Sequence, residues 1–237
     1  MPVLGRYAAK VVRRAWLKLP FVGADGYNVS ELMRIRAAMD TADYCMVHMP
    51  RARTFPSSRD ILTFALSRVS IKGAYLEFGV ASGKTINHIA KQVSGTVHGF
   101  DSFEGLPEDW RTGFEKGAFG QKAPSVHANV QLHVGWFDKT LPEFVETNSE
   151  LIAFLHVDCD LYSSTREIFR RLGPRIVPGT VIVFDEYFNH PTWRQDEHKA
   201  FQEFIAERRI GFEYIGYVPS HQQVCVVMKE LESASTG

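Results

Sequence analysis

Residues Gly73 to Gly83, which read GAYLEFGVASG, decide the fold that this sequence predicts. The first part, Ala74 to Phe78, is short and apolar, as is typical of a β-strand, and the small residues after it favour a tight turn. The next segment, Lys84 to Val93, carries apolar residues at helical spacing. The stretch therefore predicts a strand, a glycine turn and a helix. Such a turn lets a ligand approach the backbone, because glycine lacks a Cβ atom, and it aims the free N–H groups of the helix at that ligand.

A second predicted strand, Thr96 to Phe100, ends in Asp101 about twenty residues beyond the glycine turn. A carboxylate at this place can accept hydrogen bonds from both hydroxyl groups of a ribose. Together, the turn and Asp101 indicate that a nucleoside-containing ligand binds at the carboxyl ends of parallel strands. The alternative is a βαβ unit whose turn only reverses the chain, because short glycine motifs also occur without a ligand.

The composition indicates one globular domain of ordinary size. The 237 residues are 45% hydrophobic and 23% charged, and 27 basic residues balance 27 acidic ones, so the net charge does not indicate a nucleic-acid partner. Cys45, Cys159 and Cys225 are odd in number and widely separated, which favours neither a disulfide framework nor a CxxC metal site. We therefore expect a reducing, cytoplasmic location. No apolar run reaches the roughly 18 residues of a membrane helix, and we expect neither a membrane span nor a signal peptide.

Residues 1–70 are predicted to form a helical extension or lid, and residues 71–237 the main domain. Over residues 3–19, apolar and basic side chains recur at helical spacing, which predicts a basic amphipathic helix. We expect it to pack on its own domain or on a sister subunit, which would allow a homodimer; a membrane surface or another partner is the alternative. Two capping boxes predict further helices, from Asn28 with Glu31 to about Met46 and from Ser57 with Asp60 to about Val69.

The remainder of the chain alternates apolar strands with helices. Further strands are predicted at Val130 to Val134, Leu151 to Val157, Thr180 to Phe184, Phe212 to Val218 and Gln223 to Met228. The connection between the last two strands is too short for a helical crossover, so they are predicted to form an antiparallel hairpin. The pattern of five βα units closed by a hairpin indicates an α/β fold with a mostly parallel sheet.

A long irregular segment, Ser102 to Asn129, interrupts this alternation. It is rich in glycine and proline and also carries several aromatic residues. A loop of this length inside a compact domain is usually functional or mobile, and its aromatic residues favour a cover over an active site. The alternative, a disordered insertion, does not fit so many aromatic residues.

Acidic side chains stand at or near the ends of four predicted strands: Glu77, Asp101, Asp158, Asp185 and Glu186. Ligands of open parallel sheets bind outside the carboxyl ends of the strands. Asp158, Asp185 and Glu186 offer the hard oxygen ligands that Mg²⁺ or Ca²⁺ prefers, and a bound cation would relieve their repulsion. Taken singly, Asp158 could instead cap the following helix, and Asp185 with Glu186 could form a solvated turn.

Two other residues of this region have chemistry to consider. His156 interrupts an apolar strand, and we expect a buried core histidine rather than a metal ligand or a base. Cys159 stands between two aspartates, whose charge disfavours a thiolate, so we do not expect a nucleophile there.

Four motifs then point to a known family: EFGVASG at Glu77 to Gly83, GFDSFEGLPE at Gly99 to Glu108, HVDCDLYSST at His156 to Thr165, and FDEY at Phe184 to Tyr187. In this order they resemble the macrocin O-methyltransferase family of class I S-adenosylmethionine-dependent methyltransferases. The resemblance runs from about Gly73 to Phe204. It implies a Rossmann-like sheet of seven strands, with helices on both faces and the last pair of strands antiparallel.

The resemblance also implies a cofactor site. Glu77 and the Gly79 to Gly83 turn would hold the methionine part, Asp101 the ribose, and Gly135-Trp136-Phe137 would lie beside the adenine. The full set that it assigns to S-adenosylmethionine is Glu77, Gly79, Val80, Ala81, Ser82, Gly83, Thr85, Asp101, Ser102, Gly135, Trp136 and Phe137. One departure is Ala81, which stands where many class I enzymes have a glycine.

For the metal, the resemblance implies Mg²⁺ held by Asp158, Asp185 and Glu186. Glu186 departs from the Asp or Asn often found there. The implied reaction is in-line transfer of the sulfonium methyl to a hydroxyl oxygen of a small-molecule acceptor, such as a sugar on a natural product, with the thioether as leaving group. Asp158 would bind the metal and steer the departing proton; the residues do not identify a separate general base or the acceptor.

Two other functional readings stay open. Asp158-Cys159-Asp160 is the Asp-x-Asp triplet of metal-dependent glycosyltransferases, although the glycine turn already accounts for a nucleoside. The domain could also keep the cofactor fold and act as a non-catalytic scaffold. A nicotinamide dehydrogenase is disfavoured because the turn does not read GxGxxG.

Overall fold

A central sheet of eight strands organises the computed structural model, which describes residues 26–231. The strand order is β1-β7-β8-β6-β5-β2-β3-β4. The strands are β1 (Arg53–Thr54), β2 (Ala74–Phe78), β3 (Val97–Asp101), β4 (Val130–Val134), β5 (Ile152–Val157), β6 (Val181–Phe184), β7 (Gly211–Tyr217) and β8 (Val224–Lys229). Only β8 runs antiparallel to its neighbours, β6 and β7. The predicted α/β fold and its antiparallel hairpin are confirmed.

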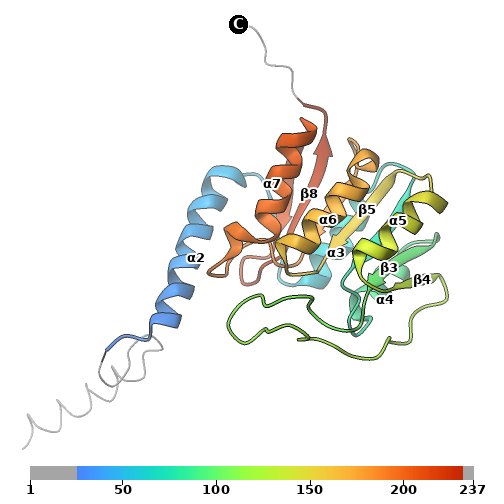
Figure 1. Ribbon diagram of the computed structural model, residues 1–237. Helices are drawn as coiled ribbons and strands as arrows, with labels where there is room; N and C mark the ends of the chain where they lie inside the picture. The colour runs from blue at the N-terminus through green and yellow to red at the C-terminus, as the bar shows by residue number, and fades with distance from the viewer. Residues whose placement is uncertain (1–25, 232–237) are drawn as a thin grey trace, which may run out of the picture.

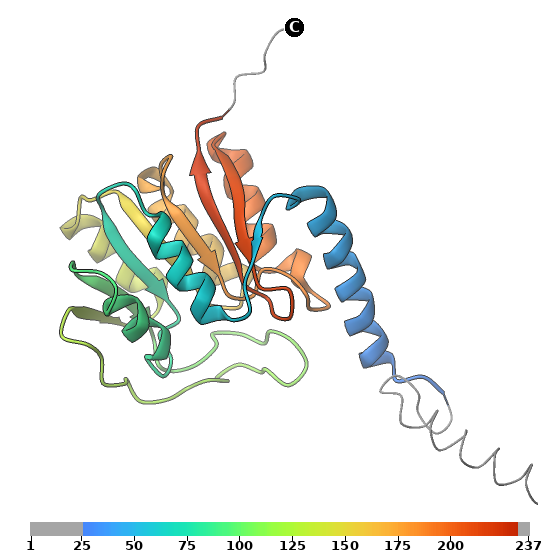
Figure 2. The same cartoon turned by 180° about the vertical axis from the view of Figure 1, so that it is seen from behind.

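Helices cover both faces of the sheet (Figures 1 and 2). They are α2 (Val29–His48), α3 (Ser58–Arg68), α4 (Lys84–Ala90), α5 (Phe137–Thr147), α6 (Tyr162–Leu172) and α7 (Glu197–Arg208), with short 3₁₀ turns η1 (Gly173–Arg175) and η2 (Trp193–Gln195). Among the residues that the structure describes, no helix combines the length and the apolarity needed to cross a bilayer.

Successive residues of β5 point to opposite faces of the sheet, and this alternation builds two cores. Phe154 packs with Ile61 of α3 and Ile86 of α4 on one face. Leu155 packs with Phe144 of α5 and Ile168 of α6 on the other. All six residues of β5 are buried, as predicted for a central parallel strand.

Several element boundaries differ from the sequence-based expectations. Helix α4 ends at Ala90 rather than Val93, and α5 begins at Phe137 rather than near Thr140. Strand β1 was not predicted, because two residues are too few to show any periodicity. The helix predicted over residues 3–19 lies outside the described residues.

The turn after β2 depends on glycine for a reason that the sequence alone did not show. Gly79 has φ of +90°, and a Cβ atom there would lie 1.7 Å from the carbonyl oxygen of Asp158. Gly79 therefore lets the end of β5 pass close to the turn, and any larger residue would push the two strand ends apart. Ala81 keeps a positive φ of 42° without being glycine.

Candidate active site

A cavity of about 640 Å³ lies at the carboxyl ends of β2, β3 and β5. Eight of the residues predicted to bind cofactor or metal line it: Gly79, Ala81, Asp101, Ser102, Trp136, Phe137, Asp158 and Glu186. The other seven, all in the described part of the chain, lie outside its wall: Glu77, Val80, Ser82, Gly83, Thr85, Gly135 and Asp185. The tertiary structure thus brings together residues from the glycine turn, from β3 and from the acidic motifs.

Asp101 connects the glycine turn to the long loop. Its Oδ2 atom accepts a hydrogen bond from the Ala81 N–H at 2.8 Å, and its Oδ1 atom accepts one from the Phe103 N–H at 2.7 Å. Carboxylate oxygens have further lone pairs, so these bonds leave acceptor capacity toward the cavity. The ribose contact stays a prediction.

Glu77 lies behind the turn rather than in the cavity wall. Its side chain is fully buried, Thr85 Oγ1 donates to its Oε1 atom at 2.7 Å, and its Oε2 atom lies 3.4 Å from His156 Nδ1. Glu77 therefore links β2, the start of α4 and β5. This position supports the turn from beneath, whereas the resemblance places the residue beside the methionine part of a cofactor.

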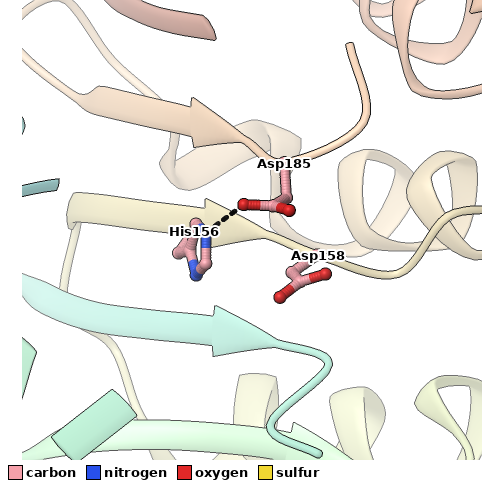
Figure 3. A group of neighbouring side chains, drawn as sticks. All are labelled: His156, Asp158 and Asp185. Atoms are coloured by element: carbon pink, nitrogen blue, oxygen red, sulfur yellow. Dashed lines mark ion pairs between the residues drawn. The ribbon is translucent and has the colours of Figure 1, made fainter. Parts of the chain in front are cut away.

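His156, Asp158 and Asp185 form a cluster at the ends of two paired strands, β5 and β6 (Figure 3). One ligand atom from each of the three residues lies within 4.8 Å of the others. His156 Nε2 is 3.9 Å from Asp185 Oδ1. Backbone bonds fix both aspartates, because the Asp158 N–H donates to the Phe78 carbonyl and the Asp185 N–H to the Val157 carbonyl, each at 2.9 Å.

Burial and mutual repulsion dominate the electrostatics of this cluster. Burial, together with the charge of Asp185, raises the pKa of Asp158 well above its ordinary value. Burial would also raise the pKa of Asp185, but the nearby imidazole of His156 and its charge outweigh burial and lower that pKa. Burial opposes a charge on His156, yet Asp185 and Glu77 raise the pKa of its imidazole well above 6.5. A proton on His156 would therefore be favoured by the carboxylates around it.

His156 belongs both to the buried strand β5 and to the acidic cluster. It is fully buried as predicted, but neither ring nitrogen has a hydrogen-bond partner that satisfies distance and angle among the described residues. The only sequence signal that His156 lies beside the carboxylates was its position as a polar residue inside an otherwise apolar strand.

Glu186 and Glu197 extend the acidic region. Glu186 lines the cavity, and its buried Oε2 atom has no hydrogen-bond partner in the described part of the chain. Its backbone N–H donates to Oε2 of the fully buried Glu197 at 3.1 Å, which ties the loop after β6 to the start of α7. Burial, then the charge of Asp185, raises the pKa of Glu186 well above 4.5. Nothing in the sequence near Glu197 indicated this contact.

Asp160 and Cys159 complete the end of β5. Asp160 has a positive φ of 64°, and burial raises its pKa to about 7 against the opposing charge of Arg111. Cys159 also lines the cavity, and burial raises the pKa of its thiol well above the usual value, which agrees with the expectation that it is not a nucleophile.

The long loop between β3 and β4 crosses the edge of the sheet where the parallel strands end (Figure 1). Gly105, Leu106, Pro107 and Phe119 of this loop contribute to the cavity wall. Ser163 Oγ at the start of α6 donates to Glu108 Oε1 at 2.5 Å. The Trp110 ring meets the His190 ring edge-to-face at 6.0 Å, and the Arg111 guanidinium lies 3.7 Å over Trp110. The predicted cover is therefore part of the site.

Comparison with known proteins gives one family match. Residues 76–187 match a family model described as "Methyltransferase domain". The 8-demethyl-8-(2,3-dimethoxy-alpha-L-rhamnosyl)-tetracenomycin-C 4'-O-methyltransferase of Streptomyces olivaceus is 31% identical over 107 residues, 37% of this chain and 40% of that protein. The demethyldecarbamoylnovobiocin O-methyltransferase of Streptomyces niveus is 30% identical over 127 residues, 44% of this chain and 47% of that protein. The chain thus spans less than half the length of these curated relatives.

Solved structures agree with the fold. CalS11, a calicheamicin methyltransferase, superposes with a TM-score of 0.57 at 21% identity, covering 72% of this chain and 77% of that one. The O-methyltransferase NovP gives a TM-score of 0.55 at 21% identity, covering 73% and 79%. Residues 76–187 thus resemble a methyltransferase domain in sequence, and two O-methyltransferases are about 30% identical to parts of the chain.

Proposed function

We propose that this protein is an S-adenosylmethionine-dependent O-methyltransferase that methylates a hydroxyl group of a small acceptor, a sugar or another natural product, with the help of Mg²⁺. The observation that carries the proposal is the convergence on one cavity of the glycine turn with Asp101 and of the acidic cluster with Asp158. The name of the Streptomyces olivaceus relative contains a rhamnosyl group, which supports a sugar-containing acceptor.

The residues of the cavity suit the cofactor. Its volume lies in the range of about 300 to 1,000 Å³ typical of ligand sites. Asp101 has acceptor capacity for ribose hydroxyls, Trp136 and Phe137 offer aromatic surface for an adenine, and the turn at Gly79 and Ala81 exposes backbone. S-adenosylmethionine would supply an electrophilic methyl group on a sulfonium. Glu77 and Thr85 would act from behind, by holding the turn in shape.

The acidic cluster suits a divalent cation. The carboxylates of Asp158 and Asp185 lie within 4.8 Å of each other, and the buried Oε2 atom of Glu186 has no partner among the described residues. Such closely spaced oxygens repel one another unless protons or a cation neutralise them. Mg²⁺ held by Asp158, Asp185 and Glu186 would acidify the acceptor hydroxyl. His156 would orient Asp185 through their contact.

This chain's own residues would then position the reactants. Asp158 lines the cavity together with the glycine turn, and it would steer the proton that leaves the hydroxyl. The long loop lines the cavity. It would exclude water and hold the acceptor close to the methyl donor, from which much of the rate would come.

The organisation and location of the protein follow from the same proposal. Residues 71–237 would form the methyltransferase domain and residues 1–70 an extension that helps to shape the acceptor pocket, although α3 already packs in the core of the sheet. Cys45, Cys159 and Cys225 are free thiols, which supports action in a reducing cytoplasm.

Calorimetric titration tests the cofactor, and product formation tests the reaction. We expect the full chain to bind S-adenosylmethionine, and not a UDP-sugar or NAD, and to release S-adenosylhomocysteine with glycosylated natural products when Mg²⁺ is present. EDTA should suppress the transfer. Binding of a UDP-sugar alone would support the glycosyltransferase alternative, and cofactor binding without transfer to any acceptor of a broad panel would support the scaffold.

A further inference from the structure

Helix α2 buries one face against the other residues that the structure describes. Ala37, Thr41 and Tyr44 are its buried residues. The Asn189 N–H donates to Thr41 Oγ1 at 3.0 Å, and the Tyr44 hydroxyl lies 2.6 Å from the Tyr214 hydroxyl. In both views of the ribbon, α2 stands at the edge of the molecule (Figures 1 and 2). The residues on the opposite side of the helix are exposed within the described part of the chain.

This outer side carries an apolar stripe, which we define as Leu32, Ile35, Met39, Ala42 and Met46. Leu32 and Ile35 are 39% and 42% exposed, Met39 and Met46 are 65% and 69% exposed, and Ala42 is exposed as well. At about 100° per residue, the stripe lies on the side of the helix opposite to its buried residues. It extends over roughly 21 Å, from the rise of 1.5 Å per residue.

The concentration of apolar surface on α2 is unusual within this protein. Of twelve exposed large hydrophobic residues in the described part of the chain, eight lie between Tyr27 and Val47. Single exposed apolar residues need no explanation, but a contiguous set marks an interaction surface. A helix that is apolar on two opposite sides is expected to be covered on both.

The spacing of the stripe identifies the kind of partner. Successive members are three, four, three and four residues apart, which is the heptad pattern of a helix that packs against another helix. A helix that lies on a membrane carries an excess of Lys and Arg on its polar side, whereas α2 has the acidic residues Glu31, Asp40 and Asp43 against Arg34 and Arg36. A second helix is therefore the better match.

Charged residues beside the stripe indicate that the partner helix is α2 of a second copy of this chain. Arg36 and Asp43 have opposite charges and lie on the same flank of the stripe. Arg36 is about one turn before Met39, and Asp43 is about one turn after it. In an antiparallel pair, positions on this flank face each other across the interface. Two copies of α2 related by a two-fold axis would bring each Arg36 toward Asp43 of the other copy, with small Ala42 near the centre.

We propose that the stripe on α2 binds the same stripe of a second copy of this chain, in an antiparallel helix pair that makes the protein a homodimer. The proposal does not depend on the methyltransferase function. Because the inner side of α2 contacts Asn189 and Tyr214, dimerisation would also hold α2 against the segment that follows β6.

Sedimentation equilibrium of the full chain tests the proposal. We expect twice the chain mass of 26.8 kDa at micromolar concentration. Met39→Glu should weaken association by about a hundredfold, because it places two charges in the apolar seam. Met33→Glu is the matched control, since Met33 is 51% exposed on the same helix but lies off the stripe, and it should leave the dimer intact. Circular dichroism confirms that both variants are folded.

A charge exchange tests the arrangement of the two helices. Arg36→Glu and Asp43→Arg should each weaken the dimer by about fivefold to tenfold, and together they should restore it, because the opposite charges face each other again. A chain that stays monomeric at 100 μM, or equal effects of Met33→Glu and Met39→Glu, would overturn the dimer. A double variant as weak as the single variants would overturn the antiparallel pairing.

Discussion

The Ala81 N–H donates to Asp101 Oδ2 across 2.8 Å, and this bond joins the glycine turn after β2 to the end of β3. The same carboxylate accepts a bond from the Phe103 N–H at 2.7 Å, at the start of the long loop. One side chain thus sets both the turn and the loop that border the cavity. Cofactor binding and local stability should therefore depend together on Asp101.

Asp101→Ala should weaken S-adenosylmethionine binding at least about tenfold and lower the free energy of unfolding by about 1–3 kcal/mol, because two backbone N–H groups lose their acceptor. Calorimetric titration and urea denaturation measure the two effects. Asp109→Ala is the control, since Asp109 accepts the Lys116 N–H at 2.8 Å in the same loop but lies away from the cavity wall. Unchanged cofactor affinity in Asp101→Ala would remove Asp101 from the cofactor site.

Asp158→Asn should abolish stabilisation by Mg²⁺, because it removes one of two closely spaced carboxylates. For the unaltered protein, Mg²⁺ at about a hundred times its Kd should raise Tm by about 5 to 10 °C, and this shift should vanish in the variant. Asp138→Asn, an exposed acid on the rim of the same cavity, should keep the shift. A Tm that Mg²⁺ does not change in the unaltered protein would count against the metal site.

Stability should fall as the pH drops from about 6.5 to about 4, partly because of His198. Burial, and then the charge of Arg194, lower the pKa of His198 to about 4 in the folded protein. The unfolded chain binds a proton at a pKa near 6.5, so between these values the unfolded state holds more protons and stability is lost on acidification. At pH 5 this amounts to about 1–2 kcal/mol.

His198→Gln should reduce this pH dependence, because glutamine does not titrate and can still bond to the Tyr44 hydroxyl, which lies 3.2 Å from His198 Nε2. Urea denaturation at pH 7.5 and pH 5 measures the difference. His221→Gln, at an exposed histidine, should leave the dependence as it is. If the free energy of unfolding falls equally between pH 7.5 and pH 5 in all three proteins, another group causes the acid sensitivity.

Glu108→Ala should make the long loop easier to open, because Glu108 accepts the bond from Ser163 Oγ that anchors the loop to α6. An exposed bond of this kind is worth about 0.5–1.5 kcal/mol, so trypsin should cleave at Arg111 and Lys116 up to about tenfold faster. Glu104→Ala, at an exposed residue of the same loop, is the control, and trypsin should cleave this variant at the same rate as the unaltered protein. Combining Glu108→Ala with Ser163→Ala should increase the cleavage rate little beyond that of either single variant. Fully additive effects of the two substitutions would show that the bond between Glu108 and Ser163 does not anchor the loop.

Local patterns in the sequence predicted most of the elements. The strand over Ala74–Phe78, the glycine turn and the alternation of strands and helices are local properties, since burial on one or both faces leaves a periodic trace in the chain. The closing hairpin followed from the short connection between β7 and β8. The carboxylates at strand ends could be predicted as neighbours because all parallel strands end at one edge.

Only the tertiary structure decided which side chains face one another. The register that pairs Glu77 with His156 places a buried acid beside the histidine, and no local pattern records the register of strands so far apart in the chain. For the same reason only the structure shows that Glu77 contacts Thr85 and His156, while its contact with the cofactor stays a prediction. Periodicity in the sequence shows which residues are buried. Which ionisable side chains lie close enough to shift one another's pKa depends on the pairing of distant strands, because that pairing is set by the packing of the whole sheet.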